Sequence, residues 1–153
     1  MSYTVADVKK LREETGAGML DCKKALEEVK GDFEAAKEVV RKKGLAKAEK
    51  KADRETKEGY IASYVHMTNK VAAMVEVLCE TDFVARNEEF QKVAKDVAMH
   101  VVAMNSESVE ELLKEPFIKD PSKTVEELVK EISGKTGERL VVNRFKRFEI
   151  GQE

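Results

Sequence analysis

The chain has few of the residues that build disulfides, metal sites and many enzyme active sites. Its 153 residues include two cysteines and two histidines. Cys22 and Cys79 lie far apart and form no paired C-x-x-C pattern. Because each falls on an apolar face, we expect two buried thiols and no disulfide, which fits a reducing compartment. His66 and His100 lack the spacing of a zinc site, so we expect neither a bound metal nor another cofactor.

Motifs of catalysis are also missing. Gly134-Lys135-Thr136 ends like a phosphate-binding P-loop, but that motif needs a glycine at position 129, where this chain has valine. A helix is predicted before this segment, whereas a P-loop follows a strand. The sequence contains no G-x-S-x-G nucleophile elbow and no cysteine with an identifiable base. We therefore expect a binding protein and not an enzyme.

Charge and hydropathy argue against two further classes of protein. The formal net charge is −2 with 38% charged residues, so the chain as a whole has no pull toward nucleic acid or an anionic membrane. No apolar run approaches the ~20 residues that span a bilayer. The N-terminus resembles neither a signal peptide nor an Arg-rich transit segment. We expect a cytoplasmic protein that binds no membrane and makes no direct contact with nucleic acid.

Three short amphipathic helices are predicted in the first part of the chain. Thr4 and Asp7 resemble a capping box, and apolar residues follow at helical spacing. Gly16, Gly31 and Gly44 are expected to end the three helices in turn. Helices of about 10 residues are marginal alone, so the three must pack together as a bundle.

A basic segment follows the helices. Residues 41–57 hold eight basic and three acidic residues, and their apolar periodicity is too poor to bury a face. We interpret the segment as a solvated connector; a phosphate-binding strip is the alternative, although it has no aromatic residues for base stacking. The chain then divides into a helical domain at 1–45, a charged linker at 46–57 and a core domain at 58–153.

The core domain begins where the apolar pattern changes to the period of a strand. Residues 71–79 alternate as a strand with one buried face, and 60–66 form a second strand joined to it by a turn at Thr68-Asn69. Residues 140–150 are rich in β-branched and aromatic side chains and predict a third strand. A three-stranded antiparallel sheet is therefore expected.

Helices complete the core domain. Asn87 is placed to cap a long helix whose apolar stripe runs from Phe90 to Met104. Ser108 and Thr124 each open an S/T-x-x-E capping box. The fold class is α+β: a three-helix bundle, a linker, and a core of helices packed on a three-stranded sheet.

The segment Thr81-Asp82-Phe83-Val84 joins a buried strand to the long helix, and a loop at that place needs no phenylalanine. The residues alone leave two interpretations open. In the first, Phe83 folds back onto the hairpin while Asp82 or Thr81 caps a turn. In the second, Phe83 is exposed to fill a partner's pocket and Asp82 alters the charge there.

Five blocks of the sequence resemble bacterial translation elongation factor Ts, and they occur in the order of that family. They are TGAGMLDCKKAL at 15–26, TDFVARNEEF at 81–90, DVAMHVVAMN at 96–105, PFIKDPSKTV at 116–125 and RFKRFEIG at 144–151. Together they span nearly the whole chain. The resemblance implies a guanine nucleotide exchange factor for the GTPase elongation factor Tu.

The resemblance also implies where the GTPase binds. The first domain would be a ubiquitin-associated-like bundle that docks on the nucleotide-binding domain through Arg12, Met19, Leu20 and Lys23, and His100 of the core would contact the GTPase as well. The segment from Thr81 to Val84 would intrude near the magnesium ion. Loss of that ion's charge neutralisation would then release GDP.

The short form of the family, which this chain resembles, works as a homodimer, and a 2:2 complex with the GTPase is expected. Some short relatives have a cysteine where this chain has Lys146, so a disulfide between subunits at this position is excluded and the dimer must depend on packing. The alternatives are a ubiquitin-associated-like adaptor, or an RNA- or ribosome-associated binding protein, each without exchange activity.

Overall fold

Three N-terminal helices pack around a small apolar core, as the sequence predicts. The structure is a computed structural model and describes residues 3–152. The helices are α1 (Val5–Thr15), α2 (Met19–Glu28) and α3 (Phe33–Lys50). The Thr4–Asp7 capping box opens α1. The buried side chains come from all three helices: Val8, Leu11, Cys22, Ala25, Leu26, Ala36 and Val40.

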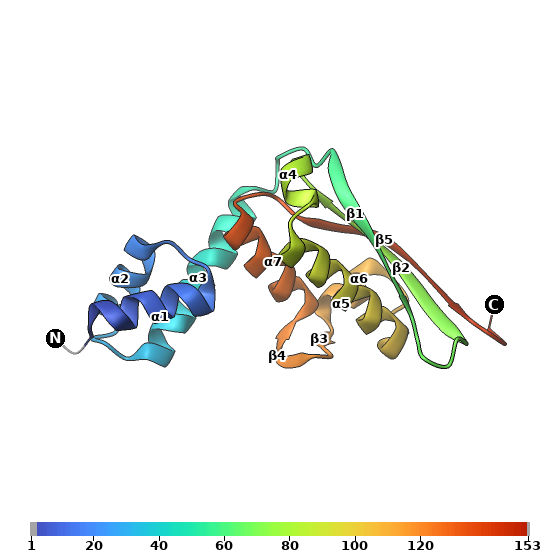
Figure 1. Cartoon of the computed structure of the whole chain (residues 1–153), viewed down its shortest axis with the longest axis horizontal. Coiled ribbons are helices and arrows are strands. Elements are labelled where there is room, and N and C mark those ends of the chain that lie inside the picture. The colour runs from blue at the N-terminus through green and yellow to red at the C-terminus, as the bar shows by residue number, and fades with distance from the viewer. Residues whose placement is uncertain (1–2, 153) are drawn as a thin grey trace.

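Helix α3 does not end at Gly44, as the residue pattern predicts, but continues to Lys50. The second half of α3 packs on α7 (Val125–Thr136), as Figure 1 shows. A Cβ atom added to Gly134 of α7 would lie 3.7 Å from Cα of Gly44, so the two helix backbones approach closely here. Packing therefore offsets the low helix propensity of glycine, about 1 kcal/mol below alanine. The proposed boundary after residue 45 falls inside one helix, and the division into domains stays a prediction.

The three predicted strands form one antiparallel sheet in the order β1–β2–β5. They are β1 (Glu58–Val65), β2 (Val71–Cys79) and β5 (Val141–Glu149). Asn69 takes a left-handed conformation, φ 58°, in the tight turn between β1 and β2. Alternation along the central strand puts Ala73, Val75, Val77 and Cys79 on the buried face.

Helices cover one face of this sheet. The long helix α5 (Glu88–Met104) starts at Asn87, whose side chain accepts the N–H of Phe90, and its apolar stripe lies on the sheet. Helix α6 (Val109–Lys114) starts at Ser108. Met104, expected in the buried stripe, is exposed in the last turn of α5. No helix of the described chain covers the opposite face of the sheet (Figure 1).

A second, two-stranded sheet, which the sequence pattern does not predict, lies between α6 and α7. Its strands are β3 (Pro116–Phe117) and β4 (Asp120–Thr124). Strands this short show no period in the sequence, and two prolines in them argue against a strand. Phe117 is buried and holds the hairpin on the core. None of the helices in residues 3–152 is long and apolar enough to cross a membrane.

Candidate partner-binding site

The exposed phenylalanine lies on a one-turn helix, α4 (Asp82–Ala85), between β2 and α5. The Thr81 hydroxyl caps this turn by accepting the N–H of Val84 at 3.3 Å, and Val84 and Ala85 are buried against the core. Phe83 is 85% exposed. The capped turn of the first interpretation is therefore present, but Phe83 does not fold back onto the hairpin and projects into solvent.

Asp82 is the first residue of α4 and lies beside Phe83. Its carboxylate forms an ion pair with Arg86 at 2.5 Å, and both side chains are largely exposed. An exposed pair of this kind contributes at most about 1 kcal/mol. The carboxylate is therefore free to exchange Arg86 for a group of a partner. The turn offers an aromatic ring and a negative charge side by side.

A second exposed set lies on the helical bundle, on both sides of the turn that joins α1 and α2. Met19 and Leu20 begin α2 with 37% and 62% of their surface exposed, and Lys23 follows one helical turn later. Arg12 is exposed in the last turn of α1. All four predicted docking residues are therefore exposed on the two helices that flank this turn, and two of them are apolar and two are cationic.

His100, the remaining predicted contact residue, is fully buried. Its Nδ1 accepts the N–H of Ile118 at 3.1 Å, so Nε2 carries the proton and donates to Glu115 at 3.0 Å. The ring also stacks on Phe117. His100 fixes the β3–β4 hairpin on α5, and a direct contact with a partner would need this hairpin to move.

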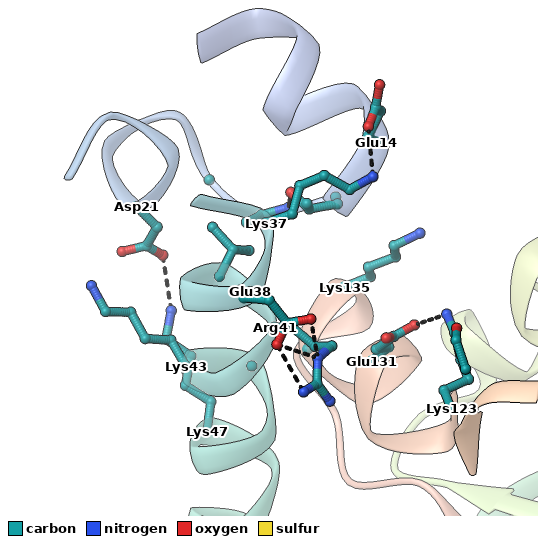
Figure 2. Close-up of a pocket in the computed structure, with 18 of the residues that line it drawn as sticks. Glu14, Asp21, Lys37, Glu38, Arg41, Lys43, Lys47, Lys123, Glu131 and Lys135 are labelled. Carbon is teal, nitrogen blue, oxygen red and sulfur yellow. Dashed lines mark hydrogen bonds and ion pairs between the residues drawn. The ribbon is translucent and has the colours of Figure 1, made fainter. Parts of the chain in front are cut away.

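A groove of about 660 Å³ separates the bundle from the core (Figure 2). Its charged side chains are matched in ion pairs: Lys37 with Glu14, Lys47 with Asp21, Arg41 with Glu38, and Lys123 with Glu131. The hydrogen bond from Lys47 lowers the pKa of Asp21.

Within residues 3–152, no group of three or more histidine, cysteine or acidic side chains is placed to hold a metal ion.

Glu138 is a residue of this site that the sequence analysis missed. Its carboxylate lies against Thr81, at the base of α4, although the two residues are 57 positions apart. The sequence near Glu138 indicates only that this residue follows Gly137, the left-handed residue that ends α7. Nothing in that pattern indicates which other segment the carboxylate meets.

These features define a class of protein: a binding protein with an anchored, solvent-exposed acid–aromatic turn and a separate apolar patch on a helical bundle. Comparison with known proteins identifies the family within this class of binding protein. The chain belongs to the elongation factor Ts family. The family's sequence model, Elongation factor TS, matches residues 80–153. Together with the relatives that match almost the whole chain, this match confirms the resemblance found in the five sequence blocks.

Relatives match almost the whole chain. The elongation factor Ts of Thermodesulfovibrio yellowstonii is 42% identical over 99% of this chain and 98% of its own length. That of Herpetosiphon aurantiacus is 41% identical over 99% of each. The protein of Aquifex aeolicus is 53% identical over 97% of this chain, which spans 53% of that relative. The alignment with the Thermodesulfovibrio protein covers 196 positions, so this relative has residues that the 153-residue chain lacks.

Proposed function

We propose that the chain is a guanine nucleotide exchange factor for the GTPase elongation factor Tu and acts in translation elongation in the cytoplasm. Membership of the elongation factor Ts family supports this role. The structural observation that carries it is Phe83, an aromatic side chain 85% exposed on a turn whose last two residues, Val84 and Ala85, are buried. Rigid exposed aromatic residues are typical anchors of protein interfaces.

The mechanism is a displacement and not a chemical reaction. Magnesium bridges the nucleotide phosphates and the GTPase, and it neutralises concentrated negative charge. Insertion of Asp82 and Phe83 beside this site moves the elements that hold the ion, and nucleotide affinity falls. The coupling is reciprocal, so nucleotide weakens the binding of the factor as much as the factor weakens the binding of nucleotide. GDP leaves, and GTP then expels the factor.

Two parts of the chain share the binding. The patch formed by Arg12, Met19, Leu20 and Lys23 docks on the nucleotide-binding domain and supplies affinity. The turn at Thr81–Val84 supplies the displacement. His100 contributes indirectly, because its hydrogen bonds hold the β3–β4 hairpin in place.

The test compares GDP release with binding. A stoichiometric amount of the chain should accelerate release of a fluorescent GDP analogue from elongation factor Tu. Phe83→Ala should reduce that acceleration by about tenfold or more, as loss of an interface anchor does. Affinity for nucleotide-free elongation factor Tu should fall less, because the bundle still docks.

Val5→Ala provides the matched control, since Val5 is an exposed apolar residue at the end of α1 remote from Arg12. It should leave release unchanged. Failure of the unaltered chain to accelerate GDP release would rule out the exchange function and favour an adaptor. Equal losses of release and affinity in Phe83→Ala would make Phe83 a simple anchor.

We also propose that two copies of the chain associate through the uncovered face of the sheet, which gives a 2:2 complex with the GTPase. Large apolar side chains gather on this face: Ile61, Val65, Met74 and Phe148 are all exposed. Strand register places Phe148 beside Ala72, which pairs in turn with Val65. An exposed apolar cluster of this kind is typical of an interface, and the same cluster on both copies suits twofold symmetry.

A further inference from the structure

Helix α4 is too short to keep its shape unaided. A single helical turn is unstable in isolation, and the two side chains that α4 presents, Asp82 and Phe83, are exposed. Its geometry therefore depends on what holds its ends. Val84 and Ala85 hold the C-terminal end through burial, so the N-terminal end, at Thr81, decides the direction of the turn.

Glu138 supplies that hold with three hydrogen bonds. Its Oε1 accepts the backbone N–H groups of Glu80 and Thr81, each at 3.0 Å, and its Oε2 accepts the Thr81 hydroxyl at 2.6 Å. Hydrogen bonds to a carboxylate are about twice as strong as neutral ones. Because the Thr81 hydroxyl donates its hydrogen bond to Glu138, the lone pairs of the hydroxyl oxygen remain free to accept the N–H of Val84. Glu138 thus sets the cap of α4.

Glu138 is itself fixed by the end of α7. Its backbone carbonyl accepts the Ser133 hydroxyl at 2.5 Å, and its N–H donates to the Thr136 hydroxyl at 3.4 Å. Gly137 takes a left-handed conformation, φ 79°, which turns the chain out of α7 and aims residue 138 at the sheet. The end of α7 therefore fixes the backbone from which the carboxylate extends.

Glu80 completes the connection from the opposite side. Its carboxylate accepts the N–H of Arg139 at 2.5 Å and contacts the guanidinium of Arg54 at 3.4 Å. Arg54 also donates to the Gly137 carbonyl, and Arg139 donates to the Arg54 carbonyl. The strand end before α4 and the junction after α7 thus hold each other, and both contact the segment that follows α3.

The buried Lys51 extends this connection to the helical bundle. Its Nζ donates to the Ser133 carbonyl at 3.0 Å, directly after α3 ends. The bundle that carries Met19 and Leu20 is therefore joined, through α3 and the end of α7, to the base of the acid–aromatic turn.

We propose that Glu138 is a positioning residue, which holds α4 so that Asp82 and Phe83 enter the partner in one orientation relative to the docked bundle. The proposal rests on the proposed exchange function and adds to it a residue that acts through Thr81 without touching the GTPase. If Glu138 had a purely structural role, as an acceptor at a strand end, it would only stabilise the fold. Its substitution would then reduce GDP release and binding by equal amounts.

The experiment uses the full chain with Glu138→Ala and Glu138→Gln, and Glu126→Ala as control, since Glu126 is a carboxylate of α7 paired with Lys130. Amide hydrogen exchange by NMR should show the N–H groups of Thr81 and Val84 exchanging about tenfold or more faster in Glu138→Ala, as hydrogen bonds to a charged group are lost. Amides of the central strand should be unchanged. Glu138→Gln, which keeps one oxygen acceptor, should lie between.

The second measurement is GDP release at saturating factor. Its maximal rate should fall about tenfold in Glu138→Ala, with an affinity for nucleotide-free elongation factor Tu within about threefold of the unaltered chain, because docking is retained.

Three results would overturn the proposal: Thr81 and Val84 amides that exchange at the original rate in both variants, an equal increase for all amides, or an unchanged maximal rate of release. Failure of the underlying exchange function looks different, since the unaltered chain would then not accelerate release.

Discussion

Cys79 shows at the scale of one residue how burial changes chemistry next to the candidate site. Its side chain is fully buried, and burial raises the pKa of the Cys79 thiol to about 11. The thiol donates to the carbonyl of Thr81 at 3.2 Å, so it also helps to hold the base of α4. The two cysteines expected to be buried are both free and buried.

This burial predicts a low reactivity. In a Cys22→Ala variant, Cys79 of the folded chain should react with a disulfide reagent at pH 8 at least about tenfold more slowly than after unfolding in urea, since the thiolate is the reactive form. The pKa of Cys79 in the folded chain lies above the ordinary value of 9.0. The contribution of the buried, protonated thiol to folding stability is therefore complete below pH 9 and is lost as the pH rises toward 11. Reaction of the folded chain at the unfolded rate would contradict the assignment.

Glycines show at the scale of elements how the same residue type serves two purposes. Gly16 ends α1 with a φ of 72°, and a Cβ atom there would lie 2.6 Å from Cγ of Lys135. Gly44 lies inside α3, where an added Cβ atom would meet nothing within 4 Å. The first glycine is required by the backbone conformation and the second is not.

The two positions therefore predict opposite effects of alanine. Gly16→Ala should lower the free energy of unfolding by about 1 kcal/mol, because an L-residue is strained in the left-handed region. Gly44→Ala should raise it by about 0.5–1 kcal/mol through better helix propensity. Urea unfolding followed by circular dichroism measures both. A loss of stability in Gly44→Ala would mean that the contact between α3 and α7 requires glycine on both helices.

At the scale of the whole molecule, the helices lie on one side of the sheet, and the bundle is joined to the core through α3 (Figure 1). The exposed turn at Asp82–Phe83 lies at the end of the sheet where β2 passes into α4. The uncovered face of the sheet is formed by alternate residues of all three strands. The proposed dimer through this face would leave the bundle and the turn accessible on each copy.

Phe148→Glu tests that dimer. Phe148 is 69% exposed on the uncovered face, and a charge there should be unfavourable in a packed interface. Sedimentation equilibrium should give about twice the 17.2 kDa of one chain for the unaltered protein and about 17.2 kDa for the variant. Phe83→Glu alters a still more exposed phenylalanine outside the sheet and should stay dimeric. An unaltered chain that sediments as a monomer would exclude the dimer.

The sequence by itself determined the features that depend on near neighbours: the caps at Thr4, Asn87 and Thr124, the turn at Asn69, and the strands with their buried faces. A cap joins residues three positions apart, and an apolar period is repeated along one element, so both can be read from the chain.

Only the tertiary structure decided the rest. It continued α3 past Gly44 because α7 packs there, it buried His100 under the β3–β4 hairpin, and it left Phe83 in solvent. It also brought Glu138 to Thr81 across 57 positions. Contacts at such separations depend on how whole elements pack. The packed surfaces that stabilise these contacts come from distant parts of the chain, and a local sequence pattern does not show which surfaces meet.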